Sequence, residues 1–139
     1  MRLEVTRKAD LATRALALLT SEERRAKAAE LAEALGTSSG FVAQVMTPLV
    51  SRGWVRSVPG PAGGYVATVR PGEISVLAVI EAVDGPTDNG RCVMEDRPCA
   101  GGRGGECALH HAWARARAAM LSELAETPLS DLHLAGTAP

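Results

Sequence analysis

Residues 27–53 read KAAELAEALGTSSGFVAQVMTPLVSRG, and this stretch predicts two short helices joined by a tight turn. Its first nine residues carry leucine and alanine at helical spacing and stop at Gly36, a residue suited to the left-handed conformation that ends many helices. The second helix is expected over 39–52, with the hydroxyl of Ser38 available as its N-terminal cap. Pro48 should kink this helix or tighten its last turns.

The two helices carry the residue pattern of a helix-turn-helix. Ala32, Gly36, Val42 and Val45 follow one another at spacings of four, six and three. A small residue is needed where two helices cross, glycine at the tight turn, and two apolar residues to seat the second helix on the first. Any helical hairpin that ends in glycine could show the same pattern, so the flanking segments must help to decide between the two interpretations.

The flanking segments complete the order of a winged helix. A first helix is expected after a capping hydroxyl at Thr6. Two β-rich runs, 54–58 and 65–69, follow the helix pair, and the proline- and glycine-rich residues 59–64 between them predict a hairpin with a flexible tip. A short helix is expected over 74–83, closed by the Asp-Gly-Pro that comes next.

The chain is therefore expected to be mainly α with a small β-hairpin wing, a winged helix-turn-helix with a long C-terminal helix. We place the DNA-binding domain at 1–86, a cysteine-rich loop at 87–107 and a dimerisation helix with a tail at 108–139. The loop is longer than a simple connection between two elements needs to be in so small a protein, so we expect it to have a function. The helix after it is expected to carry the dimer, because it has one apolar stripe: Leu109, Trp113, Ala116, Met120 and Leu124.

Composition and charge narrow the class of protein. No apolar run reaches the roughly 20 residues needed to cross a bilayer, and a cytoplasmic location is the expectation. Residues 1–70 hold ten Lys/Arg against six Asp/Glu, whereas residues 71–139 hold five against ten. Such asymmetry suits an N-terminal half that approaches phosphate. Aromatic residues make up only 3% of the chain, which favours duplex DNA over RNA or single strands as a partner.

The start of the second helix of the pair is the part that enters a major groove in helix-turn-helix proteins. Its candidate base-contacting residues are Ser38, Ser39, Gly40, Ala43 and Gln44. Gln44 is the first choice, because its amide can make a bidentate contact to adenine. Arg52 and Arg56, near the wing, are candidate phosphate contacts. The alternative for each residue is an ordinary solvated side chain.

Cys92, Cys99 and Cys107 follow the spacing C-x6-C-x7-C. Three cysteines cannot all pair within one chain, and thiolates are soft ligands that hold iron-sulfur clusters or zinc. No CxxC pair is present, and such a pair would have favoured zinc or thioredoxin-like chemistry. The alternatives are a zinc site and three unrelated thiols.

Several short motifs carry a resemblance that covers nearly the whole chain: MRL at 1–3, DLA at 10–12, RAL at 14–16, GPAGGY at 60–65, AVDG at 82–85, the three cysteines, and C-x2-H-x2-W from Cys107. In these motifs the chain resembles the winged-helix regulators that include IscR, an iron-sulfur biogenesis regulator, and NsrR, a nitric oxide sensor. The resemblance implies a homodimer that binds a palindromic DNA operator. It also implies an iron-sulfur cluster on the three cysteines, whose state alters the affinity for DNA.

The resemblance supplies two candidates for the fourth ligand of the cluster. His110 stands where IscR-like members supply a histidine to a two-iron cluster in the same subunit. Asp10 stands where NsrR-like members supply an aspartate to a four-iron cluster from the partner subunit. We favour His110 and a 2Fe-2S cluster, because Cys107 and His110 lie about one turn apart at a helix start, and Asp10 can instead pair with Arg14.

The sequence thus predicts a transcription regulator, expected to be a repressor and not an enzyme, that senses redox state, nitric oxide or iron-sulfur status through its cluster. Two alternatives stay open. One is a cluster-free or zinc-bound DNA regulator that senses thiol oxidation. The other is a small electron-transfer protein, against which the helix-turn-helix argues.

Overall fold

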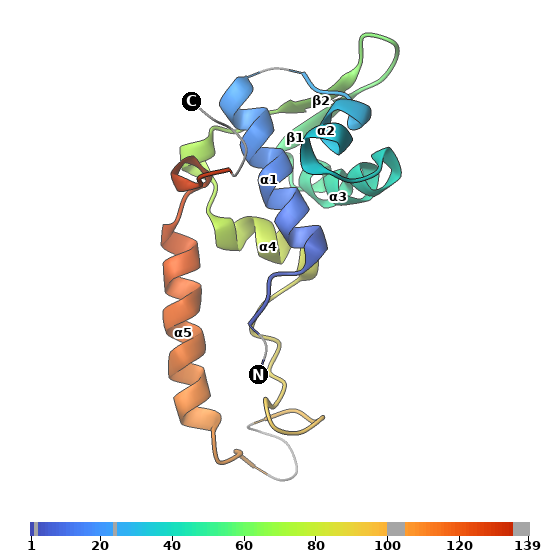
Figure 1. Ribbon diagram of the computed structural model, residues 1–139. Helices are drawn as coiled ribbons and strands as arrows, with labels where there is room; N and C mark the ends of the chain where they lie inside the picture. The colour runs from blue at the N-terminus through green and yellow to red at the C-terminus, as the bar shows by residue number, and fades with distance from the viewer. Residues whose placement is uncertain (2, 24, 100–104, 135–139) are drawn as a thin grey trace.

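The computed structural model describes residues 1, 3–23, 25–99 and 105–134, so parts of the predicted loop and tail, 100–104 and 135–139, lie outside the described residues. Within the described ranges the chain is mainly helical with a two-stranded hairpin, as predicted. The elements, in chain order, are α1 (Arg7–Glu22), α2 (Ala28–Leu35), α3 (Ser39–Ser51), β1 (Val55–Val58), β2 (Gly64–Ala67), η1 (Pro71–Glu73), α4 (Val76–Asp84), α5 (His110–Glu126) and η2 (Leu129–Asp131) (Figure 1).

Helices α2 and α3 form the predicted helical pair. Gly36 ends α2 in the left-handed conformation, with φ of 66°, and the Ser38 hydroxyl caps α3 by accepting a hydrogen bond from the backbone N–H of Phe41 at 3.2 Å. Val42 and Val45 are buried, as a helix seated on its neighbour requires. Helix α3 continues through Pro48 to Ser51, one residue short of the expected end.

The core is built around α1. Its inward face meets α3 on one side and α4 on the other, and the largest side chains that are fully buried come from α1, α3 and α4. Full burial of a leucine or valine stabilises the fold by about 1.5–3 kcal/mol. These side chains are Leu16, Leu19, Met46, Leu49, Val42, Val45 and Val79.

The wing is anchored to the segment between α1 and α2. Strands β1 and β2 pair antiparallel from Val55 opposite Ala67 to Val58 opposite Gly64, so the ladder is slightly shorter than the predicted strands. Ala26 joins the outer side of β2, where it exchanges backbone hydrogen bonds with Tyr65 at 3.0 and 2.8 Å. The hairpin therefore behaves as part of a small three-segment sheet.

Helix α5 extends alongside α4 and away from the rest of the helices (Figure 1). It begins at His110, two residues after the predicted start, and none of its residues is buried. The chain then returns to the core at η2, where Leu129 is 2% exposed and its backbone N–H donates to Ile74 at 2.9 Å. Among the described residues, no helix combines the length and the apolar character needed to cross a membrane.

The approach of the wing to Ala26 predicts that Gly64→Ala destabilises the protein by about 1–3 kcal/mol. Gly64 has φ of +140°, and a Cβ there would lie 2.7 Å from the carbonyl oxygen of Ala26. Urea or thermal unfolding measures the change. The control is Gly40→Ala on α3, where a Cβ meets nothing within 4 Å, and helix propensity should stabilise it by about 0.5–1 kcal/mol. Equal stability of the two variants would contradict the proposed contact.

Candidate metal centre and nucleic-acid interface

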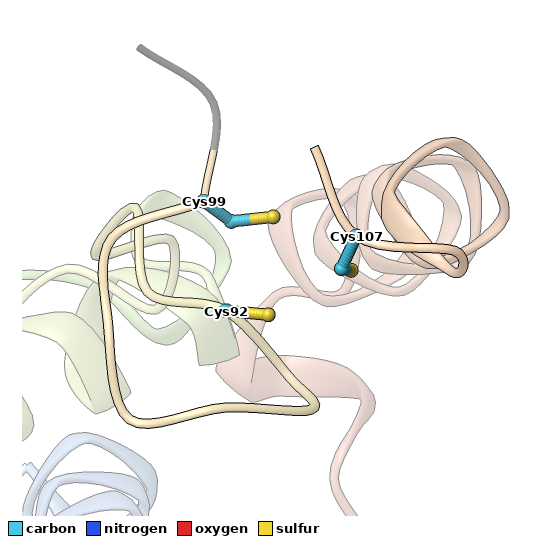
Figure 2. A group of neighbouring side chains, drawn as sticks. All are labelled: Cys92, Cys99 and Cys107. Carbon is cyan, nitrogen blue, oxygen red and sulfur yellow. The ribbon is translucent and has the colours of Figure 1, made fainter. Parts of the chain in front are cut away.

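The structure brings the three cysteines together. Their sulfur atoms all lie within 4.8 Å of one another, and each residue is half-buried. In Figure 2 the side chains of Cys92 and Cys99 extend in the same direction, toward the segment that carries Cys107. Among the described residues this group of soft donors is the arrangement that best suits a metal ion or an iron-sulfur cluster.

Backbone hydrogen bonds explain how residues seven positions apart become neighbours. The N–H of Cys92 donates to the carbonyl of Arg97 at 2.8 Å, and the N–H of Cys99 donates to the carbonyl of Gly90 at 3.0 Å. These bonds fold residues 90–99 into a hairpin-like turn with both thiols on the same side. Arg97 also donates through Nη1 to the carbonyl of Gly105 at 2.9 Å, which draws the Cys107 segment toward the turn.

The first and third thiols have different environments. The pKa of Cys92 is lowered, mainly because the backbone N–H of Met94, 3.4 Å from the sulfur, donates to it and favours the thiolate. The pKa of Cys107 is raised, mainly because partial burial disfavours its charged form. Cys92 is therefore the more readily ionised of the two.

The thiols open onto a cavity of about 230 Å³ whose opposite wall is one face of α5. His110, Trp113 and Arg117 line this wall at spacings of three and four, which place them on one side of a helix. The predicted apolar stripe of α5 is thus divided, because Trp113 faces the thiol cavity, whereas Met120 and Leu124 line a separate groove beside α4. Sequence reasoning missed Arg117, although its helical spacing from His110 was a usable signal.

His110 lies beside the sulfurs. Its Nδ1 is 3.2 Å from Sγ of Cys99, and its Nε2 is 3.5 Å from a carboxylate oxygen of Glu106. The other oxygen of Glu106 is 2.9 Å from Nε2 of His111. A carboxylate that accepts from the outer nitrogen of an imidazole leaves the inner nitrogen free to bind a metal.

Asp10, the other candidate for a fourth ligand, lies in the first turn of α1. Its carboxylate pairs with Arg14 one helical turn on, at 3.3 Å, and about half of its side-chain surface is exposed, at 52%. Within this chain the structure does not group Asp10 with the three sulfurs.

The candidate DNA-contacting residues are all exposed. All five residues at the start of α3, Ser38, Ser39, Gly40, Ala43 and Gln44, are exposed. Arg56 projects from β1 and is exposed. Arg52 is also exposed, and its guanidinium lies 5.7 Å from the ring centroid of Trp54, so a cation–π contact orients it.

The family match and a curated relative agree on the kind of protein this is. The Rrf2 family, described as an iron-dependent transcriptional regulator, matches residues 5–134. The HTH-type transcriptional regulator IscR of Serratia proteamaculans is 38% identical over 95 residues, which are 68% of this chain and 56% of that protein. The chain therefore spans little more than half the length of that relative.

Two solved structures share the fold. CymR, the global cysteine regulator of B. subtilis, superposes with a TM-score of 0.75 at 24% identity, covering 94% of this chain and 95% of that chain. IscR of T. potens superposes with a TM-score of 0.71 at 22% identity, covering 93% of this chain and 85% of that chain. At these identities the similarity establishes the fold alone, and it confirms the predicted winged helix.

The opposite pKa shifts predict which thiol reacts first in the metal-free protein. Near neutral pH Cys92 holds the larger thiolate fraction, because its pKa is lowered and that of Cys107 is raised, and thiolate is the nucleophile. We expect iodoacetamide to modify Cys92 before Cys107, and the preference to shrink as pH rises. Peptide mass spectrometry of a time course measures the two rates. Denatured protein is the control, since the rates should converge there, and equal rates in the folded protein would contradict the assignment.

Proposed function

Since this chain belongs to the Rrf2 family of transcriptional regulators, we propose that it binds its operator under the control of an iron-sulfur cluster held by Cys92, Cys99 and Cys107. Regulation of transcription through DNA is what the relatives share, and the chain is not an enzyme. The observation that carries the proposal is the convergence of the three sulfur atoms within 4.8 Å.

The donor set fits such a cluster. Three half-buried thiols face one cavity, and cysteine thiolates are the common ligands of these clusters. We assign the fourth position to His110, because its Nδ1 already lies beside Cys99, and we favour a 2Fe-2S cluster. Asp10 of a partner subunit, with a 4Fe-4S cluster, is the alternative. When bound, the cluster would supply a centre that gains or loses an electron in response to redox state. Nitric oxide or oxidation could also remove the cluster from the protein.

The residues of the chain then convert the state of this centre into DNA affinity. The cysteines and His110 hold the described parts of the loop, 87–99 and 105–107, against α5, so a change at the thiols changes the order of these segments and the position of that helix. Gln44 and its neighbours at the start of α3 read base edges, whereas Arg52 and Arg56 bind phosphates. The winged helix, 1–86, is the DNA-binding domain in this proposal.

We infer that the regulator acts as a homodimer formed through α5. No residue of this helix is buried in the single chain. Met120 and Leu124 line a groove of about 330 Å³ together with Val5 and Ile80. Val5 is 52% exposed, an unfavourable state for an apolar side chain that a second copy of α5 would relieve. A twofold dimer suits a palindromic operator and the action of a repressor.

A second candidate function is a cluster-free regulator that senses thiol oxidation. The observation that favours it is the grouping of three free thiols within 4.8 Å, since a readily ionised cysteine beside two other thiols is the arrangement of a redox-sensing cysteine, and the pKa of Cys92 is lowered. The two candidates differ in what the thiols bind, and iron and sulfide analysis separates them.

The cluster proposal predicts that Cys92→Ala, Cys99→Ala and Cys107→Ala each prevent stable cluster binding but leave a folded dimer, because the helical core is separate from the loop. Protein reconstituted anaerobically with ferrous iron and sulfide is assayed by visible absorbance, iron and sulfide content, and sedimentation. Iron kept at the wild-type level in all three variants would refute the site. Colourless wild-type protein would instead favour the thiol regulator. For the fourth ligand, we expect His110→Ala to change the spectrum and lifetime of the cluster, and Asp10→Ala to leave both unchanged.

The DNA interface predicts different effects for two exposed residues. Gln44→Ala should weaken operator binding by about 1–3 kcal/mol and leave nonspecific binding nearly unchanged, if the amide contacts a base. Arg56→Ala should weaken both kinds of binding and lower the salt dependence by about one unit, because it loses a phosphate contact. The measurement is a salt titration on an operator selected from random duplexes and on a scrambled duplex. Equal losses on both duplexes for Gln44→Ala would exclude base reading.

A further inference from the structure

Helix α5 contacts the cysteine loop at two points on one face. The first is His110, next to Cys99. The second is Arg117, seven residues later and two turns along the same face, whose Nη1 donates to Oδ1 of Asp88 at 2.8 Å. This ion pair joins residues 29 positions apart, and the Arg117 side chain is only 19% exposed. Both residues line the thiol cavity.

The contact at Asp88 continues to Cys99 through backbone groups. Oδ1 of Asp88 also accepts the N–H of Gly90 at 3.2 Å, so the carboxylate fixes the turn that Gly90 begins. The carbonyl of Gly90 in turn accepts the N–H of Cys99 at 3.0 Å. A continuous series of hydrogen bonds therefore runs from the guanidinium of Arg117 to the backbone of Cys99.

The ion pairs of Arg91 and Arg97 do not reach α5. Arg91 pairs with Asp96, and Arg97 pairs with Glu95, both inside the loop. The pair of Arg117 with Asp88 differs, because a largely buried guanidinium on a helix meets a carboxylate on a distant segment. Charge-assisted bonds of this kind are stronger than neutral ones, although the exposed side of Asp88 weakens the attraction by solvent screening.

We propose that Arg117 is a positioning residue that holds Cys99 at the thiol cavity through Asp88 and Gly90, and thereby couples the cysteine loop to α5. His110 and Arg117 then hold Cys99 by its side chain and by its backbone, respectively. The positioning does not depend on a bound cluster. The consequence for cluster retention rests on the function proposed above. The test therefore has two arms, one for the positioning of Cys99 in the metal-free protein and one for the retention of a cluster.

The first arm uses the full-length, metal-free protein. In Arg117→Met, which keeps much of the side-chain length but removes the charge, amide hydrogen exchange at Gly90 and Cys99 should become about fivefold to tenfold faster. Arg117→Lys, which keeps the charge, should lie between this variant and the wild type. The matched control is Arg115→Met, at an exposed arginine of the same helix, which should leave both amides unchanged. If the amides of Gly90 and Cys99 exchange in Arg117→Met at the same rates as in the Arg115→Met control, the proposal is overturned.

The second arm uses protein reconstituted anaerobically with ferrous iron and sulfide. Arg117→Met should still take up the cluster but lose it about fivefold faster than the Arg115→Met control, as followed by visible absorbance. Asp88→Asn should act similarly, and the double variant should be no worse than the more affected single one, because both break the same contact. Additive effects would contradict the proposal. If wild-type protein takes up no cluster, the proposed function fails, and hydrogen exchange alone decides the positioning role.

Discussion

The burial of one face of α1 is the contact on which the other elements depend. Leu16 and Leu19 are buried on α1, and α1 packs against both α3 and α4, so it joins the α2–α3 pair to the helix that leads into the cysteine loop. The start of α1 is fixed as well, since the Thr6 hydroxyl accepts the N–H of Ala9 and donates to the carboxylate of Asp84 at the end of α4. The helix pair α2–α3 and the end of α4, from which the cysteine loop starts, therefore belong to the same packed core.

The thiol cavity is organised differently, by hydrogen bonds and ion pairs rather than by apolar burial. None of its three cysteines is fully buried, and the loop places them with backbone bonds around Gly90 and Arg97. Few buried apolar contacts and many exposed backbone bonds are typical of segments that open at low free-energy cost. Such a segment can take up or release a group without disturbing the core, because the core does not rely on it.

Sequence reasoning reached the elements that local patterns determine. Gly36 marked the turn, and the three cysteines that the sequence singled out lie together in the structure. Sequence reasoning did not place Trp113 at the thiol cavity, for a physical reason. Periodicity locates a residue on a helix face, but it does not say which of two neighbouring segments that face meets. The ion-pair partner of Arg117 was beyond reach for a similar reason, since the position of Asp88 is set by the path of a segment with no regular secondary structure.

The two ends of α5 are attached with unequal firmness. Just past its C-terminal end, Leu129 is embedded at 2% exposure, whereas the N-terminal half meets the cysteine loop through the polar contacts of His110 and Arg117 and through the wall of the thiol cavity. The helix, about 25 Å long at 1.5 Å per residue, is thus held more firmly at its C-terminal end than at its N-terminal end. For a helix of this length, a displacement of about 2 Å at the N-terminal end is a rotation of about 5° around Thr127. With this geometry, a small chemical event at the thiols would reorient the surface of α5 at which we propose that a second chain binds.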